Sequence, residues 1–195
     1  MIYLFARTED LPDSFIDCCA GFLPEWRTEQ MMRYRFSSDR KLCAVAYLLL
    51  VYGLKKEGLF TALPQFSYGD SADAGTASGS KPALSNYPDI FFNLSHCKGA
   101  AVCAISNKPV GIDIERVDAY EESLAKQICN EQQYDWVNEL PAENAYRLTE
   151  IWAKKESVVK CTGVGLEEDL HAISTEGCQV TRWQEGNTEY IISVK

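Results

Sequence analysis

Residues 111–115 read Gly-Ile-Asp-Ile-Glu, and this short stretch decides our interpretation of the fold. Asp113 and Glu115 alternate with the β-branched residues Ile112 and Ile114. Because successive side chains of a strand point to opposite faces, an extended conformation places both carboxylates on one face and both isoleucines behind them. The pattern therefore predicts a strand that packs through its isoleucines and presents two acids together.

A second charged pattern lies about forty residues further on, where residues 152–160 read Trp-Ala-Lys-Lys-Glu-Ser-Val-Val-Lys. Residues three or four positions apart share one side of a helix, so this segment predicts a stripe of one aromatic ring, one acid and two amines. The stripe consists of Trp152, Lys155, Glu156 and Lys160. We expect the indole to anchor the helix in the core and to fix the direction of the Glu156 carboxylate. Three carboxylates and two lysines together indicate divalent-metal phosphate chemistry.

The remaining segments alternate between strand-like and helix-like patterns, which indicates an α+β fold. The clearest helix runs over residues 40–56, because residues 37–39 supply capping side chains and apolar residues then recur at helical spacing. Arg40 is expected in its first turn. Further strands are predicted at residues 1–6, 90–95, 100–105 and 110–117, further helices at 10–19, 118–140 and 143–161, and two or three strands over 171–194 with a turn at 185–187.

Two connections complete this picture of the chain. Residues 107–109 read Asn-Lys-Pro, which predicts a hairpin turn that pairs strands 100–105 and 110–117. Residues 67–80 contain mainly Gly, Ser, Ala, Asp and Thr without periodicity, which is typical of a flexible surface loop. We therefore expect two α+β lobes, residues 1–108 and 109–195, each with a helix and a small antiparallel sheet.

Composition narrows the class of function. The chain has 195 residues, is 46% hydrophobic and carries a formal net charge of −9. The negative charge argues against a nucleic-acid or anionic-membrane partner, because the field of the whole molecule repels polyanions. We see neither a signal peptide nor an apolar stretch long enough to span a bilayer, so a cytoplasmic location is expected. The eight cysteines show no CxxC or zinc spacing, and most are expected to be buried small hydrophobes.

Four motifs in a fixed order resemble the signature of 4′-phosphopantetheinyl transferases. They are Lys81-Pro82, Asn93-Leu94-Ser95-His96, the acidic strand at 111–115 and the helix at 152–160. The resemblance is to the single-chain, surfactin-synthetase-activating type and spans roughly residues 30–170. It implies two pseudo-symmetric α+β lobes, a long helix and a small antiparallel sheet in each, and an active site where the lobes meet.

The resemblance also implies an activity and its site residues. The family moves the phosphopantetheine arm of coenzyme A to a serine of an acyl or peptidyl carrier protein and releases 3′,5′-ADP. Magnesium prefers carboxylate and phosphate oxygens, so Asp113, Glu115 and Glu156 are the expected metal ligands. Glu156 is also the expected proton acceptor, with Lys155 and Asp113 as further catalytic residues, and Lys155 and Lys160 would give positive charge to the pyrophosphate.

The expected coenzyme A cradle lies mainly in the first lobe. Arg40, Lys81 and His96 resemble the family's ligands for the 3′-phosphate and adenine end, and Ser95 is a further candidate donor. Ser80 stands where the family commonly has glycine before Lys-Pro. The family's basic residues before the arginine helix have only loose candidates here, which are Arg27, Arg33 and Arg35.

Other interpretations stay open at this stage. Taken singly, Asp-x-Glu on a strand is usually a solvated face, and Lys-Lys-Glu on a helix is usually an ion-pair pattern. The same residues also suit a non-catalytic module that binds coenzyme A or a carrier protein, or a metal-dependent phosphohydrolase. Two fused lobes make a monomer the expected state.

Overall fold

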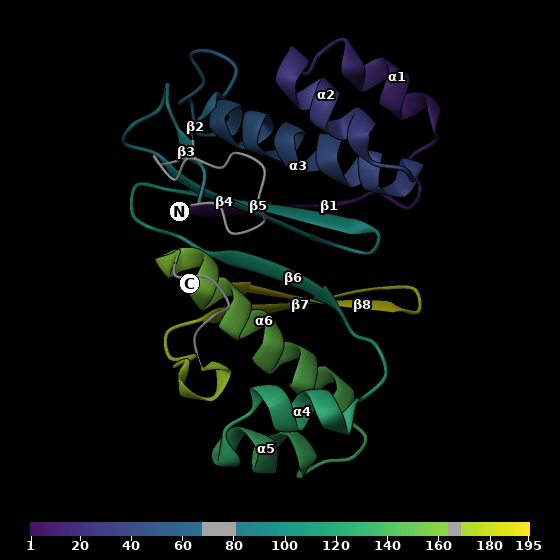
Figure 1. The fold of residues 1–195 in the computed structure, drawn as a ribbon, viewed down its shortest axis with the longest axis vertical. Helices are drawn as coiled ribbons and strands as arrows, with labels where there is room; N and C mark the ends of the chain where they lie inside the picture. Colours follow the sequence, from purple (N-terminus) through teal and green to yellow (C-terminus); the bar gives the residue numbers. More distant parts are fainter. Residues whose placement is uncertain (68–80, 164–168) are drawn as a thin grey trace. The chain divides into compact units, whose positions relative to one another are not determined.

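The computed structural model describes residues 1–67, 81–163 and 169–195, and these divide into two compact units (Figure 1). Unit 1 contains residues 1–67 and 82–108, whereas unit 2 contains Lys81 and residues 109–163 and 169–195. Both units combine α-helices with antiparallel sheets, so the α+β class predicted from the sequence is confirmed.

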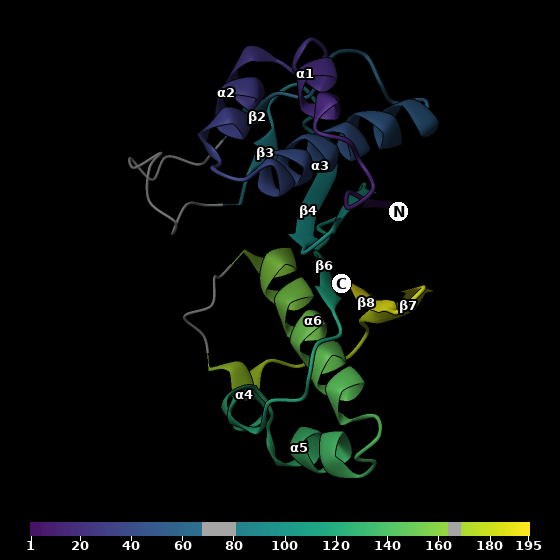
Figure 2. The same ribbon diagram turned by 90° about the vertical axis from the view of Figure 1, so that its right-hand side faces the viewer.

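Unit 1 is built on a three-stranded antiparallel sheet with the strand order β1-β5-β4, beside a small two-stranded sheet, β2-β3. The long helix α3 covers one face of the larger sheet, and helices α1 and α2 pack against the other side of α3 (Figure 2). The strands are β1 Ile2–Arg7, β2 Phe66–Ser67, β3 Ala83–Leu84, β4 Phe91–Cys97 and β5 Ala100–Ser106, and the helices are α1 Ser14–Ala20, α2 Glu25–Arg33 and α3 Ser37–Lys56.

Helix α3 is the core of unit 1, because apolar residues occur on two of its sides. Leu42, Val45 and Ala46 form one buried cluster with Ala101 of β5. Tyr47 is fully buried and belongs to a second cluster, formed with residues of α1 and α2. A helix that is apolar on both sides must lie between two layers, as α3 does.

Unit 2 also combines a three-stranded sheet with one long helix. Its three-stranded antiparallel sheet has the order β6-β8-β7, and helix α6 packs on it (Figure 2). As in unit 1, the first strand of the unit pairs with the last, and the last pairs with the one before it. The strands are β6 Ile112–Arg116, β7 Gln179–Glu185 and β8 Thr188–Val194, and the helices are α4 Glu122–Ile128, α5 Glu131–Asn138, α6 Asn144–Thr162 and the short 3-10 helix η1 Leu170–Ala172.

The ends of the helices in unit 2 follow from their sequence. Asn130 and Gln133 form a reciprocal capping box at the start of α5. Helix α6 ends at Gly163, which adopts the left-handed conformation with φ 77° and donates its N–H to the Val159 carbonyl at 2.8 Å. Helices α4 and α5 pack on the N-terminal half of α6 through a buried cluster that includes Leu148.

Most elements predicted from the sequence are present. The structure confirms the first strand, the long helix that carries Arg40 in its first turn, the helix that carries Glu156, and a C-terminal hairpin that turns at Gly186. The segment predicted as helical over 118–140 is two short helices, and α2 had no counterpart in the prediction. The loop predicted over 67–80 falls mostly on residues 68–80, which lie outside the described residues; Ser67 itself belongs to β2.

The hairpin predicted at residues 107–109 is wrong. Strand β5 pairs with β1 and β4, whereas β6 pairs with β8, so the Asn-Lys-Pro segment connects the two units instead of two paired strands. The tight turn before β5 is made at Lys98-Gly99, where Gly99 has φ 83°. A two-residue hairpin favours such a positive φ, which glycine adopts without strain, whereas proline has a φ fixed near −65°.

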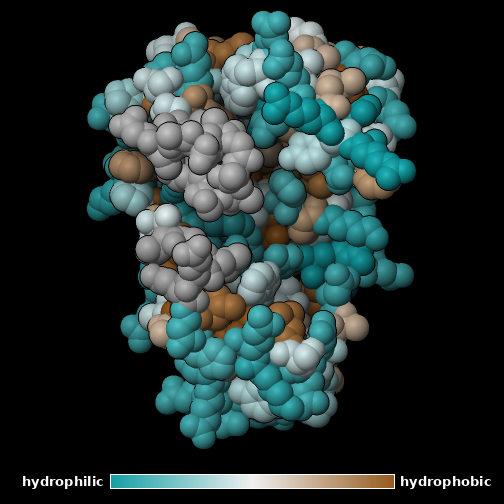
Figure 3. Space-filling model, in the orientation of Figure 1, coloured by the Kyte–Doolittle hydropathy of each residue, from teal (hydrophilic) through white to brown (hydrophobic). Residues whose placement is uncertain are grey.

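Three general properties of the described residues are their hydropathy, the polarity of their surface and the state of the cysteines. The described residues include no helix that is both long enough and apolar enough to cross a bilayer. On the face drawn in Figure 3, most described side chains are hydrophilic and hydrophobic ones form small patches. All eight cysteines have free thiols. We expected most of them to be buried, but only half are, namely Cys19, Cys43, Cys103 and Cys129.

Candidate functional site

Strand β6 turns two carboxylates toward α6. Asp113 is paired across the sheet with Ser193, whose hydroxyl lies 2.9 Å from the hydroxyl of Ser157 on α6. Side chains directly opposite each other in a ladder share one face, so Asp113 and, two residues on, Glu115 also face α6. Asp113 is only 2% exposed and Glu115 is half-buried. The prediction that both acids share one face is therefore confirmed.

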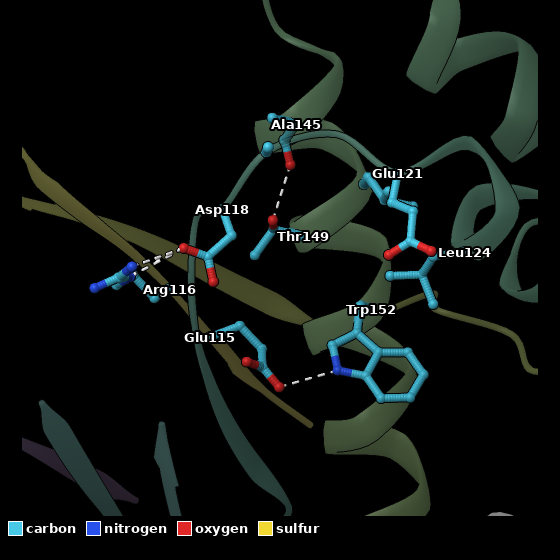
Figure 4. Close-up of a pocket in the computed structure, with 10 residues that line it drawn as sticks. Glu115, Arg116, Asp118, Glu121, Leu124, Ala145, Thr149 and Trp152 are labelled. Carbon is cyan, nitrogen blue, oxygen red and sulfur yellow. Dashed lines mark hydrogen bonds and ion pairs between the residues drawn. The ribbon is translucent and has the colours of Figure 1, made fainter. Parts of the chain in front are cut away.

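Helix α6 meets these acids with a row of three side chains at four-residue spacing. The Trp152 indole donates a hydrogen bond from Nε1 to Glu115 Oε1 at 2.9 Å (Figure 4). The Lys160 ammonium lies 2.5 Å from Asp113 Oδ1 and 3.8 Å from Glu156 Oε2. We expected Trp152 to orient Glu156 by packing; instead it binds the strand acid Glu115 directly.

Gly111 explains why the strand and the helix lie so close. A Cβ atom at this position would be 1.9 Å from the Ser157 carbonyl oxygen and 2.4 Å from the Cys161 amide nitrogen, both backbone atoms of α6. Only glycine permits this approach. The contact lies two residues before Asp113, and it brings the Asp113 carboxylate within reach of Lys160.

The acids influence one another electrostatically. Burial, and then the charge of Asp113, raises the pKa of Glu115 to about 7. Burial also raises the pKa of Glu156; the Lys160 ammonium opposes this effect and the charge of Asp113 adds to it. Glu156 Oε1 is buried and accepts no hydrogen bond from any residue in the described part of the chain. The cluster holds more negative charge than its one lysine can balance, so it favours a further cation.

Lys155 has a different setting from the one expected. Its side chain is fully buried, and Nζ donates to the carbonyl of Ile128 at 2.6 Å and to that of Leu170. Burial lowers the pKa of this lysine. The side chain therefore holds the end of α4 and the η1 turn against α6, on another side of the helix from the row that faces Asp113. Adjacent helical residues point about 100° apart, which is why Lys155 and Glu156 do not share a stripe.

Three residues of the expected coenzyme A cradle lie in unit 1. Arg40 is in the first turn of α3 and donates from Nε to the Tyr34 carbonyl at 2.9 Å. Ser95 and His96 are neighbours near the end of β4, where Ser95 is buried and His96 is exposed. His96 pairs with Ala101, the residue on which the N-terminal part of α3 packs. These three residues therefore belong to the same end of unit 1.

Lys81, the fourth expected ligand, belongs to unit 2. It is half-buried, and its Nζ donates to the Val110 carbonyl at 2.7 Å, just before the acidic strand. Burial lowers its pKa. Its side chain thus contacts the segment that leads into β6.

A pocket that the sequence analysis missed adjoins the acid cluster. Its volume is about 230 Å³, and Glu115 and Trp152 form the wall that it shares with the cluster (Figure 4). Arg116 and Asp118 form an ion pair at 2.9 Å at its edge, and Thr149 lies on α6. The remaining lining residues are Ala119, Glu121, Leu124, Ala145 and Leu148. Arg116 ends the acidic strand and Asp118 lies two residues beyond it, and this pair of charges could have drawn attention to the pocket from the sequence.

The chemistry of the donor set fits a magnesium ion. Asp113, Glu115 and Glu156 provide hard carboxylate oxygens, and Glu156 Oε1 is buried without a hydrogen-bond partner among the described residues. The charge of Asp113 raises the pKa of both glutamates, and the charge of Glu156 also raises the pKa of Glu115. Lys160 contacts two of these acids, Asp113 and Glu156. Within residues 1–67, 81–163 and 169–195, the structure contains no group of three or more His, Cys, Asp or Glu side chains close enough to hold one metal ion. The residues to hold the metal are present, and the lysine contacts two of them.

Comparisons with known proteins relate this part of the chain to one protein family. Residues 109–192, which include the acidic strand and α6, match the 4′-phosphopantetheinyl transferase superfamily. This part of the chain is similar to that superfamily. The strand acids, Glu156 and Lys160 all lie within the matched region.

Individual proteins of this family are also similar to the chain. A 4′-phosphopantetheinyl transferase of Bacillus subtilis is 34% identical over 155 residues, which cover 76% of this chain and 63% of the relative. The transferase gsp of Aneurinibacillus migulanus is 44% identical over 80 residues, covering 40% of this chain and 33% of the relative. Sfp of Bacillus subtilis strain 168 is 33% identical over 95 residues, covering 48% and 42%. The matched part of the chain thus covers from 33% to 63% of the length of these relatives, less than two thirds in each case.

Proposed function

We propose that this protein transfers the 4′-phosphopantetheine group of coenzyme A to a serine of an acyl or peptidyl carrier protein and releases 3′,5′-ADP. The observation that carries the proposal is the convergence of Asp113, Glu115, Glu156 and Lys160 on the facing surfaces of β6 and α6. The similarity of residues 109–192 to the superfamily supports it, because the matched region contains all four residues.

Asp113, Glu115 and Glu156 would hold the magnesium ion that the superfamily generally uses. When bound, the ion would offset negative charge on the diphosphate of coenzyme A and on the departing ADP. Carboxylates on two different elements suit this role, because the close contact at Gly111 fixes the strand against the helix. The positions of the ligands then depend on packed backbone and not on a loop.

Glu156 is the proposed proton acceptor for the carrier serine. Its Oε1 is buried and has no hydrogen-bond partner among the described residues, so a lone pair is available to take the proton. Lys160 would give its positive charge to the diphosphate during transfer. We assign Lys155 a positioning role, since both of its described hydrogen bonds go to backbone carbonyls of unit 2.

Arg40, Ser95, His96 and Lys81 are proposed to bind the 3′-phosphate and adenine end of coenzyme A. Arginine grips phosphate through the terminal nitrogens of its guanidinium, and the described bond of Arg40 to Tyr34 uses Nε. His96 is exposed at the strand end, where a ligand can reach it. This assignment draws on the family resemblance of the motifs.

We further propose that units 1 and 2 are related halves of a pseudo-symmetric fold, with boundaries at 1–108 and 109–195. The support is topological, because the strand order β1-β5-β4 corresponds to β6-β8-β7, and each sheet carries one long helix. A cytoplasmic location accords with eight free cysteines, which are usual in a reducing compartment. We expect the protein to act as a monomer.

Intact-mass analysis of an apo carrier protein tests the function directly. Incubation with the protein, coenzyme A and Mg²⁺ should add one phosphopantetheine group to the carrier, and excess chelator should prevent the addition. Binding of coenzyme A without any carrier modification would favour a non-catalytic module. Release of phosphopantetheine into solution without carrier modification would favour a phosphohydrolase.

The His96→Ala variant tests the coenzyme A cradle. It should weaken binding of coenzyme A by about tenfold, but leave binding of dephospho-coenzyme A nearly unchanged, because only the former has the 3′-phosphate. Titration calorimetry with both ligands measures the difference. Equal losses for the two ligands would remove His96 from the phosphate site.

A further inference from the structure

Lys160 holds two acids that come from different elements. Its ammonium lies 2.5 Å from Asp113 Oδ1 on β6 and 3.8 Å from Glu156 Oε2 on the same helix. The Asp113 side chain is 2% exposed and that of Glu156 is 12% exposed, whereas the Lys160 side chain retains 28% exposure. The acids are thus fixed in a buried position, and the cation that compensates them can still reach solvent.

Helix α6 contains a second lysine–glutamate ion pair of the same spacing, for which no contact with an acid of β6 is described. Lys154 pairs with Glu150 four residues earlier, just as Lys160 pairs with Glu156. Neither Lys154 nor Glu150 contributes to the raised pKa values of Glu115 and Glu156. The pair at 150 and 154 therefore provides a matched comparison for the removal of one lysine charge from α6.

We propose that Lys160 is a displaceable counter-ion, which compensates Asp113 and Glu156 in the metal-free protein and must leave them when a divalent cation binds. The inference rests on the proposed metal site. Lysine suits this exchange because its ammonium is a point charge on a flexible four-carbon stem, and its contacts with carboxylates can re-form with another anion. A carboxylate oxygen that accepts a hydrogen bond from an ammonium is less available to a metal.

The displacement of Lys160 would link the binding of the metal to the binding of the substrate diphosphate. Displacement leaves an ammonium without its carboxylates beside a newly bound cation, which is unfavourable until an anion arrives. The diphosphate of the substrate is an anion of the required kind. Metal binding should therefore be weak in the absence of a diphosphate and stronger in its presence, and by linkage the diphosphate should bind more tightly when the metal is present.

Metal binding in the absence of coenzyme A and carrier protein tests this proposal. Calorimetric titration with Mg²⁺ alone should give at least about tenfold tighter binding to Lys160→Met than to the wild type, because the competing charge-assisted hydrogen bond is gone. Lys160→Arg keeps a cation and should remain within about threefold of the wild type. Lys154→Met should match the wild type.

Thermal unfolding gives a second readout. In chelator, Lys160→Met should unfold at a lower temperature than the wild type, since two buried acids lose their counter-ion, and Mg²⁺ should raise its Tm more than that of the wild type. If Lys160→Met folds poorly without metal, Lys160→Gln replaces it in both experiments.

The possible outcomes separate this proposal from the proposed function. Equal or weaker Mg²⁺ binding to Lys160→Met, including no binding to either protein, overturns the counter-ion role whether or not the wild type modifies carriers. Tighter binding that disappears in Asp113→Asn/Lys160→Met supports it, even if carrier modification is absent. Tighter binding that survives in the double variant would show that the ion binds elsewhere and would also overturn the proposal.

Discussion

The long helices of the two units occupy equivalent places but have different interiors. Each packs on a three-stranded antiparallel sheet in which the first strand lies next to the last. The buried residues of α3 are apolar apart from the hydroxyl of Tyr47, whereas α6 buries Arg147, Lys155 and Glu156. A charged group is buried at a cost unless it is paired or performs a function. The same scaffold is therefore used for stability in unit 1 and carries the proposed chemistry in unit 2.

The first strands and the glycine contacts show the same contrast. The six residues of β1 include no acid, whereas two of the five residues of β6 are acids that face the helix. Both units bring a glycine into close contact between helix and sheet. A Cβ at Gly53 of α3 would meet the ends of the Ile105 and Leu4 side chains, whereas one at Gly111 would meet helix backbone. A side chain at Gly111 could therefore be accommodated only by moving helix backbone, whereas one at Gly53 could be accommodated by moving side-chain ends.

The largest effect is expected from the proposed proton acceptor. Glu156→Gln should lower the rate of carrier modification by about 100-fold or more while the protein stays folded, because the amide cannot accept the serine proton. Glu150→Gln, four positions from Lys154 on the same helix, should keep most of the activity. Quantitative mass analysis of the carrier over time measures both rates. Equal rates for the two variants would contradict the catalytic role of Glu156 and with it the proposed difference between α6 and α3.

Alanine at the two glycines compares the tolerance of the units. Gly111→Ala should lower the free energy of unfolding by about 3 kcal/mol or more, because the clash is with backbone that cannot rotate away. Gly53→Ala should cost no more than about 1 kcal/mol, since side-chain ends can shift and alanine is the better helix former. Urea unfolding of both variants gives the two values. A larger loss for Gly53→Ala would contradict the comparison.

Lys155 separates a structural role from a catalytic one. Lys155→Met keeps the length of the side chain but leaves the carbonyls of Ile128 and Leu170 without their donor, so the free energy of unfolding should fall by about 2–3 kcal/mol. Lys154→Met should change it by less than about 0.5 kcal/mol. Chemical unfolding provides the measurement. An unchanged stability in Lys155→Met, together with lost transfer, would return Lys155 to the catalytic group.

The smallest effect concerns Glu115 and depends on pH. Its pKa in the folded metal-free protein is raised from 4.5 to about 7, so the folded state retains a proton that the unfolded state loses between these values. Stability from this group is therefore lost as the pH rises from about 4.5 to 7 and stays low above pH 7. Glu115→Gln should remove this loss and stabilise the metal-free protein at pH 8 by about 1–2 kcal/mol.

The control for this prediction is the same pair of proteins at low pH. At about pH 4 the difference in unfolding free energy between Glu115→Gln and the wild type should nearly vanish, because this pH lies below both pKa values and both states of the wild type then bind most of the proton. Both series are measured in chelator. A constant difference from about pH 4 to 8 would show that burial of Glu115 does not control its protonation.

The sequence sufficed for features that depend on local pattern. Alternation in residues 111–115 predicted the shared face of Asp113 and Glu115, and helical spacing predicted that Trp152, Glu156 and Lys160 share one side of a helix. Pairing between distant segments could not be predicted in the same way. Asn-Lys-Pro at 107–109 resembles a turn, yet the pairing of β6 is decided by β8, which lies more than seventy residues later.

The errors at individual side chains have a similar cause. Lys155 and Lys160 both fit a helical stripe of some width, and only the packing of α4 and η1 on one side of α6 buries Lys155. The hydrogen bond from Trp152 to Glu115 depends on the depth to which β6 sits on α6, and hence on Gly111. Spacing identifies candidates for a site, whereas tertiary packing decides which of them meet.

The central claim is that the acids of β6 and α6 share one divalent cation at the site of transfer. The most direct measurement is the anomalous difference map of a crystal grown with Mn²⁺ and coenzyme A. The account predicts one strong peak within ligand distance of carboxylate oxygens of Asp113, Glu115 and Glu156, next to the diphosphate. A peak that contacts none of these residues, or a bound coenzyme A whose diphosphate lies away from them, would contradict it.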